Sequence, residues 1–419
     1  MMPIIHYAFI LSIAWLVFKK WGAAYPRLFW ISFLSRVAVG AVLGLVYLYY
    51  YSANDTWIFF NDATILAQFG WRDVEGYLKF LFFDEAPGYL LDQLINSQER
   101  SLFLIKIMSL ISWLGGDTYW VSAAWFSLIS FLAAWYLFSV ITFHFEKSWV
   151  AAAIAFLFFP SIVFWSSGLV KETMALAGIY FVSGIFLKFR FNQKVRWFEW
   201  ILALGGCWVA WNLKYYWAAM FIATLITYLL VFLLRIRIPF IKNNKIATWI
   251  VIFVLLCGGV SFSHPNFYPH RFLEVLLTNH DEFVRISKDD GLIHFYQLHA
   301  SWGSVILNAP WALFSGILRP FLGEASGLMA ALASVENMVI MVLLISAMAR
   351  IRILKSPRLL LLSVGVYIVV LCVFLALSTP NLGTLSRYRI GFLPFLIFMI
   401  SYRNPLLDYL INRFRFLQS

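Results

Sequence analysis

The feature of this sequence that most constrains its fold is a series of apolar runs, each close to the length needed to cross a bilayer. A spanning helix takes roughly 20 apolar residues, and lipid admits only structures that satisfy their own backbone hydrogen bonds. The composition agrees, since 62% of the residues are hydrophobic and 12% are charged, far from the soluble average. We expect eleven spanning helices, at about 4–18, 28–50, 118–143, 148–165, 169–187, 198–213, 215–234, 246–262, 327–348, 359–378 and 389–402.

The sequence therefore predicts an all-α fold, a polytopic transmembrane helical bundle that forms a single integral membrane domain over residues 1–419. Two further apolar runs are open to interpretation. The run at 101–114 is short, and the run at 303–320 ends in Arg319-Pro320. Both are compatible with re-entrant or interfacial helices as well as with spans.

Basic residues are concentrated in alternate connections between the apolar runs. Nineteen of the 32 Lys and Arg residues lie there with three acids, whereas the rest of the chain carries 13 basic and 17 acidic residues. Because Lys and Arg accumulate in cytoplasmic loops, this pattern predicts an external N-terminus, a cytoplasmic C-terminus and outer loops at about 51–117 and 263–326. The net charge of +12 is thus a topology signal, and no nucleic acid partner is expected.

The stretch FPSIVFWSSGLVKETMALAG at 159–178 places charges between two apolar runs, on the predicted outer side. We expect a helix to begin near Ser167, so that free backbone N–H groups lie beside Lys171 and Glu172. A helix start and an ammonium group together suit a phosphate. The alternative is that the serines only cap the helix while the two charges lie in the lipid headgroup layer.

Two acids, Asp55 and Asp62, follow the second apolar run in the stretch NDTWIFFNDA. A carboxylate just outside the membrane is partly desolvated yet reachable from water, as a general base must be. The two residues are seven positions apart, so they share one face if the segment is helical. The alternative is an ordinary solvated loop carboxylate.

Three arginines on the same predicted side are candidates for binding a phosphate, because guanidinium groups match phosphate oxygens. Arg319 precedes a proline, and Arg387 and Arg389 enter the last apolar run. The alternative is that the last two only anchor a helix end by snorkelling. Two charges inside apolar runs, Arg36 and Glu336, are expected to form a buried ion pair.

Five of the seven histidines fall in the loop 263–302. Their spacing includes no HxH or HxxxH pair, so a folded polar loop is favoured over a metal site. We therefore assign no metal ligands and require no cofactor, although a divalent metal is compatible with the sequence. The five are His264, His270, His280, His294 and His299.

Taken together, the acid-bearing stretch after the second run, the basic turn at Lys171 and the late Ser-Arg387-Tyr-Arg389 before a proline-containing run resemble the GT-C superfamily of bacterial membrane glycosyltransferases. The chain also resembles bacterial multi-pass membrane proteins with the patterns PSxVFWSSGxxK and NxGTxxRYRxxxxPF. The resemblance covers most of the chain in layout. It departs from several relatives where Asn54-Asp55 stands in place of an acidic pair, which leaves open whether Asp55 or Asp62 corresponds to their acid.

This resemblance implies a GT-C-like fold in the bacterial inner membrane and an inverting transfer of a sugar from a polyprenyl-phosphate donor to a lipid or glycan acceptor at the outer face. Membrane lipids are the other expected partners. It also implies that Asp55, or else Asp62, is the catalytic base. Two alternatives remain, a polysaccharide polymerase or ligase and a lipid-linked glycan flippase or transporter. The residues implied to bind substrate or phosphate are Ser167, Lys171, Glu172, Arg319, Arg387 and Arg389.

Overall fold

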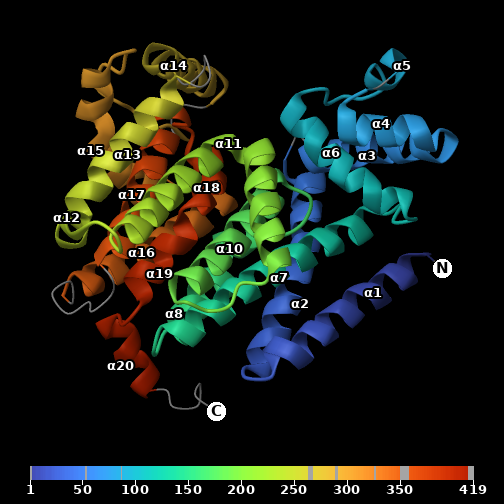
Figure 1. Cartoon of the computed structure of the whole chain (residues 1–419). Helices are drawn as coiled ribbons and strands as arrows, with labels where there is room; N and C mark the ends of the chain where they lie inside the picture. Colours follow the sequence, from blue (N-terminus) through green and yellow to red (C-terminus); the bar gives the residue numbers. More distant parts are fainter. Residues whose placement is uncertain are drawn as a thin grey trace. The chain divides into compact units, whose positions relative to one another are not determined.

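The computed structural model of the chain describes residues 2–51, 54–85, 87–262, 268–287, 291–324, 327–349 and 358–413 (Figure 1). Within these ranges every named element is a helix, which confirms the all-α prediction. Seven helices in the described ranges are long and apolar enough to cross a membrane. They are α1 with η1 (Met2–Gly22), α2 (Pro26–Tyr49), α7 (Tyr119–His144), α10 (Lys171–Arg190), α11 (Trp197–Leu234), α16 (Leu328–Met348) and α17 (Arg358–Ser378).

The remaining expected spans are shorter or interrupted. The run 148–165 divides into α8 (Trp149–Ala152), η2 (Ala153–Phe158) and α9 (Pro160–Trp165), because Pro160 cannot continue the preceding helix. The run 246–262 forms α13 (Lys245–Ser261), and the last run forms η7 (Arg389–Gly391) and α19 (Leu393–Ser401). The two ambiguous runs become α6 (Glu99–Trp113) and α15 (Trp302–Leu318).

Helix α11 contains two of the expected spans, 198–213 and 215–234, and the residue between them is not helical. Lys214 has φ −142° and ψ 65°, which interrupts the helix. The chain also divides near this point into two compact units, Met1–Tyr215 and Tyr216–Ser419. The prediction of a single membrane domain stays a prediction.

The core of the first unit consists of the long apolar helices α2, α7 and α10. An aromatic cluster joins the first two helices, with the ring of Phe29 edge-on to Phe131 at 4.9 Å and to Trp135 at 4.8 Å between centroids. Close backbone approach also contributes, since a Cβ on Gly40 would lie 2.3 Å from the Ser127 hydroxyl. Helices α2 and α7 are therefore held together by interlocking aromatic and small residues.

The predicted outer loop at 51–117 is largely helical. It contains α3 (Asp55–Arg72), α4 (Val74–Phe83), α5 (Gly88–Leu91) and α6. The Tyr77 hydroxyl lies 2.9 Å from that of Ser109, and buried Lys106 donates to the Phe80 carbonyl and to Asp84. These polar contacts hold α4 against α6.

In the second unit, α15 packs against α16 and α17, and α14 (Pro269–Ile286) covers α17. The other elements are α12 (Pro239–Asn243), α13, η5 (Leu322–Glu324), α18 (Leu382–Tyr388), η7, α19 and α20 (Pro405–Arg413). The N–H of Ile293 donates to the Pro380 carbonyl at 2.9 Å, which holds the segment before α15 against the start of α18. The second predicted outer loop is thus also partly helical.

Candidate functional site

The two candidate acids lie on α3 in different environments. Asp55 is the first residue of the helix and is half-buried, and no hydrogen-bond partner for its carboxylate occurs among the described residues. Asp62 is fully buried. Its oxygens accept hydrogen bonds from the N–H groups of Ile95 (3.1 Å) and Asn96 (3.0 Å) and from the Asn96 side-chain amide (3.1 Å). Asp62 therefore has the surroundings of a structural carboxylate that ties the segment before α6 to α3.

Lys171 is the first residue of α10 and reaches toward α3. Its ammonium group donates to the Ser101 hydroxyl at 2.8 Å and lies 5.2 Å from the centre of the Phe59 ring. Phe59 follows Asp55 by four residues and precedes Asp62 by three, so all three belong to one face of α3. The structure thus brings Lys171 to the acid-bearing face of α3.

Glu172 points to a different partner, because successive helical residues are about 100° apart. Its carboxylate is fully buried and forms an ion pair with Lys214, with 2.6 Å between Oε1 and Nζ. Sequence reasoning missed Lys214. The signal was the single lysine between two apolar runs, which coincides with the break in α11.

Ser167 does not begin or cap a helix, so that expectation is wrong. The hydroxyls of Ser166 and Ser167 donate backwards to the carbonyls of Ile162 and Val163, at 2.6 and 2.7 Å, at the end of α9. Helix α10 begins at Lys171 without a side-chain cap. The separation arises at Gly168, whose φ of +72° takes the chain out of the helix.

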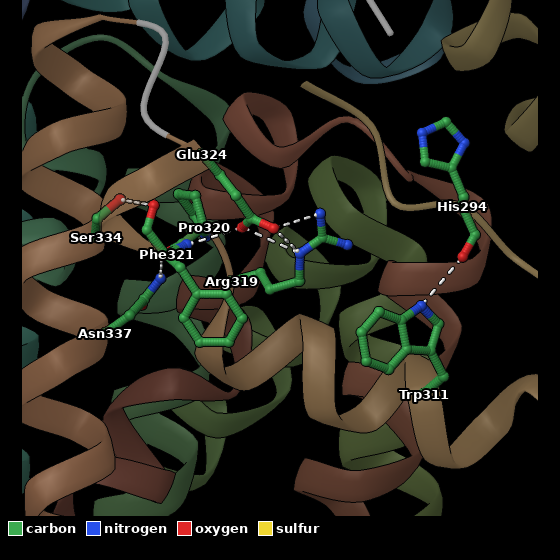
Figure 2. A network of polar contacts seen from close by, with 8 residues as sticks. All are labelled: His294, Trp311, Arg319, Pro320, Phe321, Glu324, Ser334 and Asn337. Atoms are coloured by element: carbon green, nitrogen blue, oxygen red, sulfur yellow. Dashed lines mark hydrogen bonds and ion pairs between the residues drawn. The ribbon is translucent and has the colours of Figure 1, made fainter. Parts of the chain in front are cut away.

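In the second unit, Arg319 forms a paired contact with Glu324 (Figure 2). The arginine Nε lies 2.9 Å and Nη2 2.8 Å from Glu324 Oε1, and the guanidinium group lies 5.8 Å from the Trp311 ring centre. Glu324 also accepts from the Phe321 N–H at 2.8 Å. Burial raises the pKa of the Glu324 carboxyl, but the hydrogen bonds from Arg319 and Phe321 and the Arg319 charge outweigh it, leaving that pKa below its usual value.

The two late arginines differ in accessibility. Arg389 is fully buried, and its Nη1 donates at 2.7 Å to the side-chain oxygen of Asn337. The Asn337 amide donates in turn to the Pro320 carbonyl at 2.9 Å (Figure 2). Arg387, on α18, is half-buried. Snorkelling to lipid headgroups is therefore the wrong interpretation for Arg389, which anchors a polar network inside the unit.

The expected ion pair between Arg36 and Glu336 is wrong, because Arg36 has other partners. The Arg36 guanidinium donates to the Ser130 and Ser166 hydroxyls and to the Phe156 carbonyl within the first unit. Glu336 lies close enough to Arg389 in the second unit to stabilise its charge. Each charge is thus accounted for within its own unit.

No group of three His, Cys, Asp or Glu side chains in the described ranges is arranged to hold a metal ion. Of the histidines singled out in the sequence, His264 lies outside the described residues. His280 contacts the Leu377 carbonyl at 2.7 Å, and the His294 carbonyl accepts from the Trp311 indole at 3.1 Å. These contacts link α14 to α17 and the segment before α15 to α15 itself, and the absence of metal ligands stays a prediction.

No protein-family model, curated protein or solved structure matches this chain. The long apolar helices define it as a helical membrane protein. Its function is therefore inferred from the arrangement of its own polar groups.

Proposed function

We propose that the protein is a membrane glycosyltransferase that moves a sugar from a polyprenyl-phosphate donor to a lipid or glycan acceptor. The observation that supports this most is the meeting of Lys171 with the α3 face that bears Asp55. A monophosphate donor requires a cation for the phosphate, and an acceptor hydroxyl requires a base. Both groups occur within the first unit.

The two proposed roles follow from charge. Asp55 takes the proton of the acceptor hydroxyl while that oxygen attacks the anomeric carbon. The bond between this carbon and the phosphate oxygen breaks, and the polyprenyl phosphate leaves with the electron pair, its charge stabilised by Lys171. Attack opposite the leaving group inverts the anomeric centre.

Asn54 adds a feature beside the proposed base. Its side-chain oxygen is buried without a hydrogen-bond partner in the described part of the chain. A buried acceptor of this kind gains from a donor such as a sugar hydroxyl. The side chains of Asn54 and Asp55 together therefore offer three acceptor oxygens to a hydroxyl-rich substrate.

The membrane arrangement belongs to the same proposal. We take the protein to be a GT-C-like bundle with about eleven spans in a bacterial inner membrane, with its N-terminus external and its C-terminus cytoplasmic. The basic connections support this orientation, which puts Asp55 and Lys171 at the outer face. Roles for Arg319 and Arg387 in binding the lipid phosphate stay predictions.

The test is sugar transfer by the purified full-length chain in lipid vesicles, with polyprenyl-phosphate sugars as donors. Asp55→Asn preserves the shape of the side chain but accepts no proton, so turnover should fall by roughly 10²–10⁴-fold. Full activity of this variant would remove Asp55 from the mechanism. Consumption of a polyprenyl-diphosphate glycan instead would favour a polymerase or ligase, and movement of an unaltered lipid across the bilayer a flippase.

Asp62→Asn is the matched control because it changes the same group on the same helix face. The amide places an NH₂ group among three N–H donors, so we expect a loss of stability of about 1–3 kcal/mol. Its turnover per folded molecule should remain close to that of the unaltered protein. The reverse outcome, an inactive Asp62→Asn with an active Asp55→Asn, would transfer the role of base to Asp62.

A further inference from the structure

The ion pair between Glu172 and Lys214 is a costly polar feature of the first unit. The side chains of Glu172 and Lys214 are 0% and 6% exposed, and 2.6 Å separates their charged atoms. Removing two ions from water costs several kcal/mol each, which their attraction repays only in part. An ionisable pair buried in a membrane protein is therefore a candidate functional site.

The backbone provides a second observation, since Lys214 also breaks the longest apolar helix of the described chain. Its φ of −142° and ψ of 65° interrupt the helical backbone of α11. Non-helical backbone at membrane depth is tolerated where it is buried in protein or lines a cavity, and breaks of this kind form the binding sites of many transporters. The break and the buried ammonium group occur at one residue, which a purely structural ion pair does not require.

The surroundings of the pair are rich in positive charge. Lys171 precedes Glu172 directly and contacts Ser101 on α6. Arg100, the neighbour of Ser101, places its guanidinium group 4.9 Å from the ring centre of Tyr215, which follows Lys214. The residues adjacent to the pair in the chain thus include one further cation, Lys171, and contact another, Arg100.

We propose that Lys214 is a second ligand for the lipid phosphate and that Glu172 holds it while no phosphate is bound. A phosphate that enters beside Lys171 displaces the Glu172 carboxylate from Lys214. The inference deepens the proposed glycosyltransferase function and rests on it for the source of the phosphate. The binding step itself requires no sugar transfer.

The charge change during transfer explains the use of a second cation. A sugar-linked polyprenyl phosphate is a diester with one negative charge, whereas the released monoester carries about −1.5 to −2 at pH 7. Negative charge therefore grows on the phosphate as the glycosidic bond breaks. A cation that engages this growing charge stabilises the transition state more than the bound donor.

The test measures binding of a short-chain polyprenyl monophosphate to the purified full-length chain in detergent, by isothermal titration calorimetry. Lys214→Met should weaken binding by on the order of tenfold, because it removes a charge-assisted contact. Glu172→Gln should tighten binding by roughly threefold to tenfold, because the phosphate no longer competes with a carboxylate for Lys214. A purely structural ion pair predicts weaker binding in both variants. Opposite changes in affinity therefore indicate that Lys214 binds the phosphate and that Glu172 competes for it.

The pair formed by Lys188 and Glu199 is a matched control. It is also buried and lies at the other end of α10, with side chains 17% and 9% exposed. Sixteen residues separate Glu172 from Lys188, about 24 Å along a helix. Glu199→Gln should therefore leave the affinity for the monophosphate within about twofold.

Phosphatidic acid of equal charge distinguishes the source of the phosphate. Tighter binding of the polyprenyl monophosphate than of phosphatidic acid supports a polyprenyl carrier as the ligand. Equal binding of the two shows that Lys214 binds lipid phosphates in general and overturns the assignment to a polyprenyl carrier. Unchanged or weaker binding of the monophosphate by Glu172→Gln overturns the proposal. This result decides the outcome even if Lys214→Met fails to fold. If the two variants change the affinity as expected but the protein transfers no sugar, this inference stands and the proposed glycosyltransferase function is refuted. If sugar transfer occurs and Lys214→Met does not change it, the glycosyltransferase function stands and this inference is refuted.

Discussion

Arg36 compensates for a hydrogen bond that a proline removes. In a regular helix, the Phe156 carbonyl would accept the N–H of residue 160, but this residue is proline and has none. The Arg36 Nη2 donates to that carbonyl at 2.7 Å, and its Nη1 donates to the Ser166 hydroxyl at 2.8 Å. Arg36→Met should therefore remove this hydrogen-bond donor from the interruption at Pro160.

The size of the loss can be estimated from these contacts. A hydrogen bond from a charged group contributes about 1.5–3 kcal/mol, and an unsatisfied buried carbonyl costs about 1–3 kcal/mol. Removing a fully buried charge offsets part of this, especially since the Arg36 Nε has no partner in the described chain. We expect Arg36→Met to lower the free energy of unfolding by about 2–4 kcal/mol.

A double-mutant cycle with Pro160→Ala isolates the compensation. Alanine restores an N–H four residues after Phe156, so Arg36→Met should cost about 1–2 kcal/mol less in this background. The assay is chemical unfolding of the purified protein in detergent, followed by tryptophan fluorescence. Exposed Arg72 is the control, and Arg72→Met should change stability by less than about 0.5 kcal/mol. Strict additivity of Arg36→Met and Pro160→Ala would refute the reasoning.

Three further predictions concern other parts of the chain. Gly168→Ala should destabilise by about 1–3 kcal/mol in the same unfolding assay, because φ is +72° and a Cβ would lie 3.0 Å from a backbone oxygen of α2. Gly205→Ala, where a Cβ meets nothing within 4 Å, should show no loss. The lowered pKa of Glu324 contributes stability that is complete above the usual value of 4.5 and is lost as pH falls through the lower folded value. Glu324→Gln should therefore flatten the acid side of the stability profile, and an unchanged acid side would contradict this. For topology, a cysteine at exposed Glu85 should react with a membrane-impermeant reagent on intact cells and one at Lys194 should not, in a chain whose native cysteines are replaced. Labelling at Lys194 alone would reverse the orientation.

The longest helices were readable from the sequence because their signal is local. Hydrophobic runs without proline or charge, such as 118–143 and 359–378, became single helices close to the expected bounds. The run 148–165 failed as a single helix because a proline outweighed its hydrophobicity. The break in α11 was also signalled locally, by Lys214 between two apolar runs.

The partners of the charged residues could not be read in the same way. Lys171 and Glu172 are adjacent in sequence, yet one contacts Ser101 and the other Lys214, because neighbouring helical side chains diverge. Asp62 was an alternative candidate for the base because the sequence did not reveal its partner Asn96, which lies 34 positions away. Pairings of this kind depend on how helices pack, and the sequence pattern specifies only which faces are apolar.

The nature of each partner separates buried charges that hold the fold from charges able to exchange a ligand. Arg36 donates to neutral oxygens, namely two hydroxyls and a carbonyl. An incoming anion that took these donors would leave buried carbonyls unsatisfied, so exchange is costly. Lys214 is paired with a carboxylate, for which a phosphate substitutes with like charge and similar geometry. Arg319, paired with Glu324, meets the same criterion and is the corresponding candidate in the second unit.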